Sequence, residues 1–197
     1  MSYRLQYTLI VSNTTLTLDG VSKPYSQVFN NTYPGPWIQA CWGDVLNITV
    51  INNLTTNGTS IHWHGLRQLN SFNMDGVNGV TQCPIPPPIK HKITSDNIMT
   101  YTFNTTQYGT SWYHSHYSLQ YADGLAGPLT IYGPASANYD EGRDPFLIAD
   151  WTHGSAFQLF QQEIDLNSTG PPGMDSILLN GQGKWQLCSC DRFKSVD

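Results

Sequence analysis

Two copies of a His-x-His pattern constrain this chain more than any other feature of its sequence. The first lies within Ile61–Gly65 (IHWHG) and the second within Trp112–His116 (WYHSH). In an extended strand, side chains two positions apart point to the same face and lie about 6–7 Å apart. Each motif therefore places two imidazoles on one side of a strand. Four imidazoles buried together need hydrogen-bond partners or a metal, so packing alone is the weaker interpretation.

The histidine pairs leave the identity of the metal open at first. Neutral imidazole nitrogens suit copper, zinc, iron or nickel, and a zinc hydrolase site needs only three histidines and an open position. The sequence contains neither a Gly-x-Ser-x-Gly nor a His-Glu-x-x-His motif, which argues against the common hydrolytic sites. Four histidines in paired form favour a polynuclear site, and copper is the best candidate. His91 and His153 lie outside the motifs and are interpreted as ordinary histidines.

The remainder of the sequence predicts an all-β domain. Apolar and polar residues alternate from Leu5 to Leu18, the period of a half-buried strand, and Asp19-Gly20 follows as a turn. Charged residues make up only 12% of the chain, about half the usual share. Further strands are expected at 37–42, 45–52, 99–103 and the end of 121–131. Short strands at this spacing favour an antiparallel β-sandwich or barrel.

The segment Tyr33–Pro36 (YPGP) is expected to form a rigid turn. Proline fixes its own φ, and we expect Gly35 to take the left-handed conformation that other residues avoid.

The chain divides at a polar, turn-rich stretch. We predict a first domain over residues 1–133, a linker over 134–144, and the start of a second domain over 145–197. Within this last part we expect a strand at Pro145–Trp151 and a short helix at Ser155–Ile164. The last part is short for a domain, so a truncated second domain is expected, with an atypical tail from about residue 184.

The net charge of the chain indicates which partners it could bind, and its glycosylation sequons indicate the compartment in which it is found. The net charge of −5 and the lack of a basic cluster argue against nucleic acid or an anionic membrane as a partner, and no run of 18 apolar residues spans a membrane. A secreted, extracellular glycoprotein is expected, although no signal peptide follows Met1. Asn-x-Ser/Thr sequons occur at Asn13, Asn30, Asn47, Asn53, Asn57, Asn104 and Asn167.

The cysteines fit no zinc pattern. Cys41, Cys83, Cys188 and Cys190 include no C-x-x-C pair. Cys188-Ser189-Cys190 lacks other ligands nearby, so disulfides or free thiols are the preferred interpretation.

At this point the sequence resembles a known family. It is similar to the first domain of multicopper oxidases, and most similar to laccases of filamentous fungi, over about residues 4–181. The segments that carry the resemblance are 58–66 (GTSIHWHGL), 75–85 (DGVNGVTQCPI), 109–118 (GTSWYHSHYS), 123–129 (DGLAGPL), Tyr33–Pro36 and Trp42–Asp44.

The resemblance implies a cupredoxin-like Greek-key β-sandwich followed by the start of a second such domain. It also implies copper, bound as the type 2 and type 3 ions of a trinuclear cluster. By family position, His62 binds the type 2 ion, His64 and His114 share one type 3 ion, and His116 binds the other. Asp75 and Ser118 match residues of a proton relay to dioxygen. The implied reaction oxidises phenolic or other aromatic small molecules and reduces dioxygen to water.

Departures from the family limit what this chain does alone. The family's cluster needs eight histidines and this chain has six, so a missing C-terminal cupredoxin domain is expected to supply the rest. No cysteine has a histidine neighbour, hence no type 1 copper site is expected and the isolated chain is predicted to be inactive. Cys83 matches a family cysteine that pairs with one near the far C-terminus. The alternatives are a non-catalytic copper-binding cupredoxin module and a chain that does not fold by itself.

Overall fold

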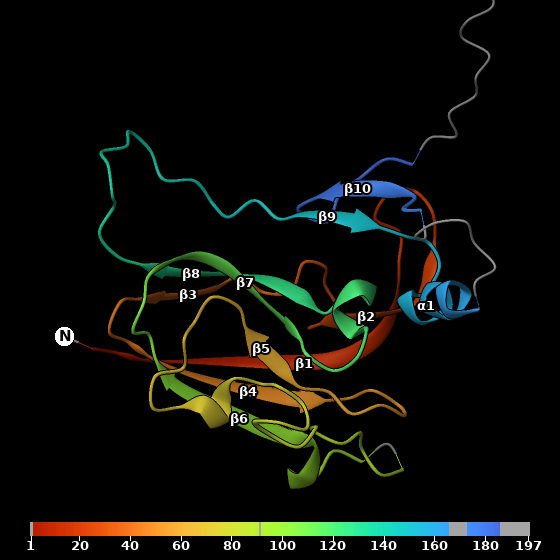
Figure 1. Ribbon diagram of the computed structural model, residues 1–197, viewed down its shortest axis with the longest axis horizontal. Helices are drawn as coiled ribbons and strands as arrows, with labels where there is room; N and C mark the ends of the chain where they lie inside the picture. Colours follow the sequence, from red (N-terminus) through yellow and green to blue (C-terminus); the bar gives the residue numbers. More distant parts are fainter. Residues whose placement is uncertain (1, 91, 166–172, 186–197) are drawn as a thin grey trace, which may run out of the picture.

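Two four-stranded sheets packed face to face form the main body of the protein (Figure 1). The computed structural model describes residues 2–90, 92–165 and 173–185. The first sheet has the order β2-β1-β4-β6 and the second has the order β3-β8-β7-β5. Their bounds are β1 Arg4–Leu16, β2 Lys23–Phe29, β3 Ile38–Cys41, β4 Val45–Asn52, β5 Ile61–Trp63, β6 Ile98–Asn104, β7 Gly109–Ser115 and β8 Ala126–Tyr132. The prediction of a mostly β protein built as a sandwich is confirmed.

The strands are not all antiparallel, and in this respect the sequence prediction was wrong. β1 pairs with β4 in parallel, and so does β3 with β8. The chain leaves the first sheet after β2, forms β3 in the second sheet, and returns to the first sheet as β4. Such crossings between layers, which are characteristic of Greek-key connections, let strands separated in sequence run side by side in one direction. Alternation along one strand carries no information about that direction.

The core lies between the two sheets. The alternation that produces this core is clearest in β4, whose residues alternate between half-buried and buried positions along the whole strand. Each sheet thereby contributes one apolar face. The fully buried core side chains include Leu9, Val11, Ile38, Leu46, Ile48, Val50, Ile61, Trp63, Tyr101 and Tyr113.

Gly35 packs closely and does not take the left-handed conformation predicted for it. It is absent from the glycines with positive φ. A Cβ at this position would lie 2.8 Å from the Tyr113 hydroxyl and 2.9 Å from the Phe29 ring. Glycine is therefore required because two core aromatic side chains approach its backbone.

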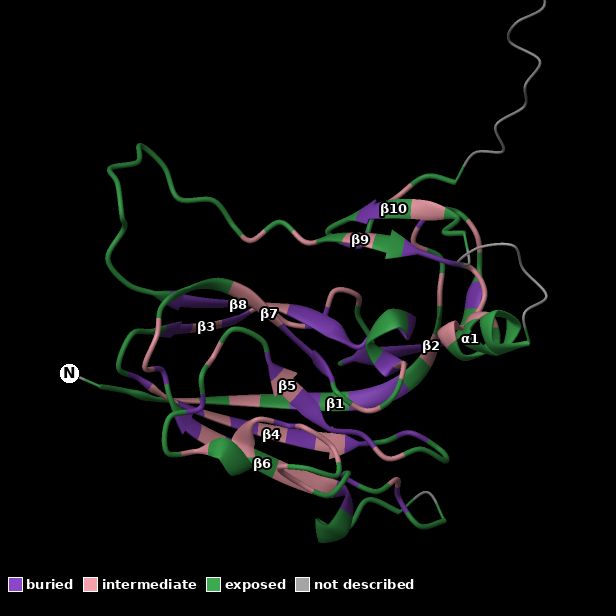
Figure 2. Cartoon of the chain, viewed as in Figure 1, coloured by how far each residue is buried: buried purple, intermediate pink, exposed green. Residues whose placement is uncertain are grey.

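A smaller segment follows the sandwich. The expected linker, residues 134–144, is exposed throughout (Figure 2). Beyond it, β9 (Ile148–Trp151) pairs with β10 (Ser176–Leu179), and α1 (Ala156–Ile164) begins after Ser155, whose side chain accepts a hydrogen bond from the Phe157 amide. The expected helix is thus present with its serine cap. Short 3-10 turns occur at Phe72–Met74 (η1), Ser95–Asn97 (η2) and Gln120–Asp123 (η3).

Two buried carboxylates of the sandwich hold this segment in place. Asp123 lies 3.1 Å from the Lys23 ammonium and accepts a hydrogen bond from the Ala156 amide at the start of α1. Asp19 lies 2.8 Å from His153 Nε2 and accepts a hydrogen bond from the Ser176 hydroxyl. His153 therefore has a structural partner, in line with its interpretation as an ordinary histidine. No helix in the described part of the chain is long and apolar enough to cross a membrane.

Candidate metal centre

The four motif histidines meet at the end of two neighbouring strands. β5 and β7 are antiparallel, and their register places His62 directly opposite His114. His64 follows β5 and His116 follows β7, so each strand end adds one imidazole. The ligand nitrogens of His62, His64 and His114 all lie within 4.8 Å of one another. The His116 ring centroid lies 5.5 Å from that of His62 and 6.2 Å from that of His114.

Backbone carbonyls fix the tautomer of two of these rings, that is, which ring nitrogen carries the proton. His62 Nδ1 donates to the Asp75 carbonyl at 2.8 Å, and His114 Nδ1 donates to the Ser115 carbonyl at 2.9 Å. A carbonyl only accepts, so the proton sits on Nδ1 and the lone pair on Nε2 is left for a metal. Burial and the neighbouring imidazoles lower the pKa of His114 to about 4, against the opposing effect of its bond to Ser115. His114 is therefore neutral near pH 7, as a metal ligand must be.

Asp75 reaches His62 because the following residue is glycine. Gly76 has φ +83°, and a Cβ there would lie 1.8 Å from the Ile61 carbonyl oxygen. Because glycine has no Cβ, the loop backbone can lie directly against β5. The Asp75 carboxylate then lies 3.4 Å from His62 Nδ1, and its side chain is 28% exposed. Asp75 thus contacts both a candidate ligand and solvent.

Hydrogen bonds from neighbouring strands and loops hold the two outer histidines. The His64 amide donates to the Trp112 carbonyl at 3.1 Å, and the His116 amide donates to the Ser60 carbonyl at 2.8 Å. The Ser115 hydroxyl donates to Gln120 Oε1 at 2.7 Å in a fully buried contact. These bonds fix the backbone at the outer histidines although their side chains are exposed.

Trp112 is a part of the site that the sequence prediction missed. Its ring stacks on His114 with centroids 4.1 Å apart and lies 5.3 Å from the His64 ring. Tyr121 adds a second aromatic ring 5.6 Å from His114. A signal was available, because Trp112 precedes His114 by two positions on a strand and so shares its face.

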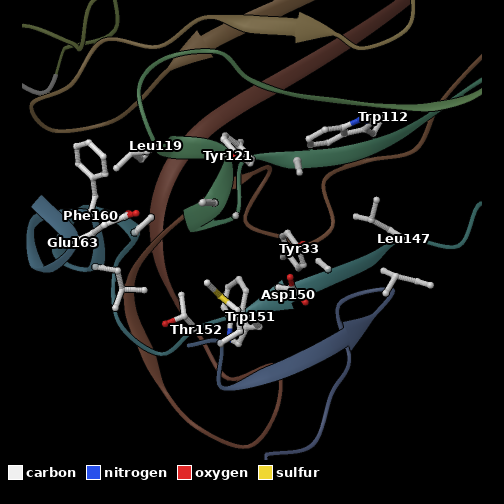
Figure 3. A pocket seen from close by; sticks show the side chains of 18 residues that line it. Tyr33, Trp112, Leu119, Tyr121, Leu147, Asp150, Trp151, Thr152, Phe160 and Glu163 are labelled. Carbon is white, nitrogen blue, oxygen red and sulfur yellow. The ribbon is translucent and has the colours of Figure 1, made fainter. Parts of the chain in front are cut away.

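Trp112 also borders a cavity of about 680 Å³ between the sandwich and the following segment. Figure 3 shows Trp112 and Tyr121 on one side, with Leu147 and Trp151 across from them. The indole therefore separates the histidine cluster from the space beside β9.

The remaining candidate residues lie outside this cluster. Ser118 is exposed, has φ +51°, and forms no hydrogen bond with the four histidines within the described residues. Cys41 and Cys83 are free and exposed. His91, Cys188 and Cys190 lie outside the described residues.

The donor set fits copper. Three imidazole nitrogens converge, two of them with a lone pair directed by a carbonyl bond to the opposite nitrogen. Such nitrogen ligands suit copper among the biological transition metals. A strand-borne histidine cluster at the edge of a Greek-key β-sandwich defines a metal-binding cupredoxin domain.

Comparison with known proteins gives the family. The chain belongs to the multicopper oxidases, since that family's sequence model, described as "Multicopper oxidase", matches residues 10–136. A laccase of Arthroderma benhamiae is 51% identical over 180 residues, which is 91% of this chain and 25% of that protein. Laccase-2 of Botryotinia fuckeliana is 52% identical over 176 residues, which is 89% of this chain and 28% of that protein.

A solved structure shows the same fold. The crystal structure of the laccase from Botrytis aclada is 48% identical and superposes with a TM-score of 0.84, covering 97% of this chain and 33% of that one. The chain therefore spans between a quarter and a third of the length of these relatives. The resemblance inferred from the histidine motifs is confirmed, and copper is the metal that the family implies.

Proposed function

We propose that this chain is the N-terminal portion of a laccase-type multicopper oxidase. The full enzyme oxidises phenolic or other aromatic small molecules by one electron at a time and reduces dioxygen to water. The observation that carries the proposal is the convergence of three imidazole nitrogens within 4.8 Å on a domain that matches the family.

The proposal assigns the four histidines to three copper ions. His62 holds the type 2 ion, His64 and His114 hold one type 3 ion, and His116 holds the other. Bound copper supplies the one-electron redox chemistry that protein side chains lack. A C-terminal cupredoxin domain contributes the remaining ligands.

Asp75 and Ser118 serve proton movement in the same proposal. The Asp75 carboxylate contacts the His62 ring edge at 3.4 Å and is partly exposed. It is placed to take a proton from solvent and hold it beside the cluster. Ser118, two residues after His116, stands at the exposed end of the second motif. Its assignment rests on the family position.

The isolated chain is expected to bind copper without turning over substrate. None of its four cysteines has a histidine neighbour, so this chain supplies no His-Cys-His for a type 1 ion. The electron entry site belongs to the rest of the full enzyme. Oxidation of a phenolic dye by the copper-loaded chain would contradict this part of the proposal.

Copper titration of the purified chain tests the ligand assignment. We expect His62→Ala and His114→Ala each to weaken copper binding by more than about 100-fold, beyond what the loss of an outer partner of a ligand costs. His153→Ala is the control, because it removes an imidazole outside the cluster. Chelator competition and electron paramagnetic resonance give affinity and ligand type. Equal binding by all the variants would refute the assignment.

A non-catalytic copper-binding module is the second candidate, and one observation favours it. Three nitrogens in one group are sufficient to hold a single ion. A magnetically coupled copper pair would support the part-cluster proposal, whereas one uncoupled ion per chain would support the module.

Secretion and glycosylation complete the proposal. Of the sequon asparagines within the described residues, Asn47 is half-buried and the others are exposed: Asn13, Asn30, Asn53, Asn57 and Asn104. Asn167 lies outside the described residues. Exposed sequons are what an extracellular glycoprotein requires. The division into domains over 1–133 and 145–197, with an atypical tail from about 184, stays part of the proposal.

A further inference from the structure

A single buried side chain, that of Gln120, connects the two histidine motifs. Gln120 belongs to η3 and is fully buried. Its Oε1 accepts hydrogen bonds from the Thr59 hydroxyl at 2.9 Å and from the Ser115 hydroxyl at 2.7 Å. Its Nε2 donates to the Gly58 carbonyl at 2.9 Å. The amide therefore ties the chain just before the first motif to the residue in the middle of the second.

These bonds lie on the face of the sheet opposite the metal ligands. Successive residues of a strand point to opposite faces, so the Ser115 side chain points away from the face that carries His114. Across the strands, Ser115 is paired with Ile61, which is fully buried in the core, whereas His114 is paired with His62. Gln120 is therefore not a ligand, and any effect it has on the metal centre passes through the residues that it holds.

Ser115 controls the orientation of the His114 ring. Its carbonyl accepts the hydrogen bond from His114 Nδ1 at 2.9 Å, which leaves Nε2 available for a metal. The Ser115 amide donates to the Leu125 carbonyl at 3.0 Å, and its hydroxyl accepts from the Tyr117 amide at 3.1 Å. The single proton of that hydroxyl goes to Gln120. The position of the carbonyl that fixes the His114 tautomer thus depends in part on Gln120.

The first motif depends on the same amide. The His116 amide donates to the Ser60 carbonyl at 2.8 Å, and Ser60 directly follows Thr59, whose hydroxyl is bonded to Gln120. β5 is only 3 residues long, so few backbone bonds hold it against β7. Gln120 supports this short pairing at the end of the strands where His116 lies.

We propose that Gln120 is a positioning residue of the metal centre. Its amide keeps the Ser115 carbonyl within reach of His114 Nδ1, and it holds the end of β5 where His116 joins the other imidazoles. Without the amide, two buried hydroxyls and the Gly58 carbonyl each lose a partner, and the local structure must shift to satisfy them. Copper at this centre is part of the proposed function, on which the proposal rests; the order of the imidazoles in the metal-free chain is not.

Nitrogen-15 NMR of the imidazoles tests the proposal on the metal-free chain at about pH 7, above the usual histidine pKa. In the unmutated protein we expect one His114 tautomer, with the proton on Nδ1. Gln120→Met keeps an unbranched side chain but removes every hydrogen bond of the amide, and it should give a mixture of both tautomers. Gln120→Glu keeps an acceptor for both hydroxyls. Because burial favours the protonated carboxyl, it also keeps a donor for Gly58, and it should retain the Nδ1 tautomer.

Gln27→Met is the matched control. It makes the same substitution at a buried glutamine of β2, whose Oε1 has no hydrogen-bond partner within the described residues. Val11→Ala, in the buried core of β1, controls for loss of stability alone. Neither should change the His114 tautomer, whatever its effect on Tm.

Ser115→Ala keeps the test available if Gln120→Met does not fold. It removes the hydroxyl through which Gln120 acts and changes the packing less. It should shift the His114 tautomer in the same direction, and adding Gln120→Met to it should shift the tautomer no further, because both changes break one connection.

Copper binding connects this role to the proposed function. Loss of an outer partner of a ligand costs about 10–100-fold in metal affinity. We expect about 10-fold for Gln120→Met, since it acts through Ser115, together with an altered electron paramagnetic resonance spectrum. If the unmutated chain bound no copper, the proposed function would fail, and the tautomer would still decide the role of Gln120.

The following results would overturn the proposal. One is an unmutated chain in which His114 carries its proton on Nε2, and another is an unchanged tautomer in Gln120→Met. The same change in Gln27→Met or Val11→Ala would show that general loss of packing is the cause. Equal copper affinity in Gln120→Met and in an unmutated chain that binds copper would likewise exclude a positioning role.

Discussion

The sandwich and the segment that follows it are held together in different ways. The sandwich, residues 4–132, buries a continuous apolar core between its sheets. In the segment, residues 145–185, the buried apolar side chains within the described residues are Trp151 and Leu178. Its large exposed apolar side chains are Phe146, Ile148, Phe157, Phe160, Ile164, Met174, Ile177, Leu179 and Trp185.

The difference shows that the segment depends on polar contacts with the sandwich. The Lys23 ammonium lies 4.3 Å from the centroid of Trp151 and forms a buried ion pair with Asp123. Asp19 contacts His153, which follows β9, and Ser176, the first residue of β10. Apolar burial is the main source of folding free energy, so a segment with so little of it is stable only where such contacts anchor it.

The largest expected effect comes from Trp63, which lies between His62 and His64 in the sequence and whose side chain is fully buried in the core. It contacts Tyr101, Phe103 and Tyr113. We expect Trp63→Ala to lower the free energy of unfolding by about 3–5 kcal/mol and to weaken copper binding. Phe160→Ala, in the exposed part of α1, should cost less than about 0.5 kcal/mol. Denaturant unfolding measures both, and similar costs would contradict the contrast between the two regions.

The second prediction concerns the ion pair. Lys23→Met leaves the Asp123 carboxylate buried without its charge partner, and Asp123 is only 2% exposed. Breaking such a pair costs about 3–5 kcal/mol. Adding Asp123→Asn should recover most of that loss, because a neutral pair has no charge to desolvate.

Hydrogen exchange locates where this loss falls. In Lys23→Met the amides of β9 and α1 should exchange faster than those of β4 and β6. Uniform acceleration over the whole protein would show that the ion pair stabilises the sandwich itself, and not its contact with the segment.

A third prediction tests whether Trp112, which lines the cavity, also contributes to copper affinity through its contact with His114. Trp112→Leu removes the ring stacked on His114, and loss of an outer partner of a ligand costs about 10–100-fold in metal affinity. Trp112→Phe keeps an aromatic face and should retain most of the affinity. Chelator competition measures the change, and the Tm of the metal-free protein serves as the control. Equal copper affinity in all three proteins would restrict Trp112 to packing.

Much of this architecture could be predicted from local pattern. The strand expected at 45–52 coincides with β4 (Val45–Asn52), and the helix expected at Ser155–Ile164 coincides with α1 (Ala156–Ile164). Period-2 spacing predicted that His62 shares a face with His64, and His114 with His116. These features depend on neighbours in sequence, whereas the meeting of the two pairs depends on the long-range pairing of β5 with β7.

Other features depend on contacts distant in sequence and could not be predicted. The parallel pairing of β1 with β4 follows from a crossing between layers. The need for glycine at Gly35 arises from Tyr113, and the place of Asp75 from the approach of Gly76 to Ile61. No pattern along the chain records such contacts.

The smallest expected effect is the pH dependence of the contact at Asp19. Burial raises the pKa of Asp19, but hydrogen bonds from Ser176, His153 and the Val21 amide outweigh it and hold the pKa below its usual value. A carboxyl with a lowered folded pKa stabilises the protein above its unfolded pKa of about 3.9, and this stability is lost as the pH falls through the folded pKa. Asp19→Asn should therefore cost about 1–3 kcal/mol near pH 7 and flatten the decline in stability between about pH 5 and 3.

Asp175→Asn is the matched control, because its carboxylate is 37% exposed and lies 3.5 Å from His153 Nδ1. It should change the pH profile of unfolding less than Asp19→Asn does, since solvent screens an exposed pair. Unfolding free energies at a series of pH values, with hydrogen exchange of β9 and β10, provide the measurement. Parallel profiles for the unmutated protein and Asp19→Asn would mean that the acid sensitivity lies elsewhere. The segment would then be anchored chiefly through Lys23 and Asp123.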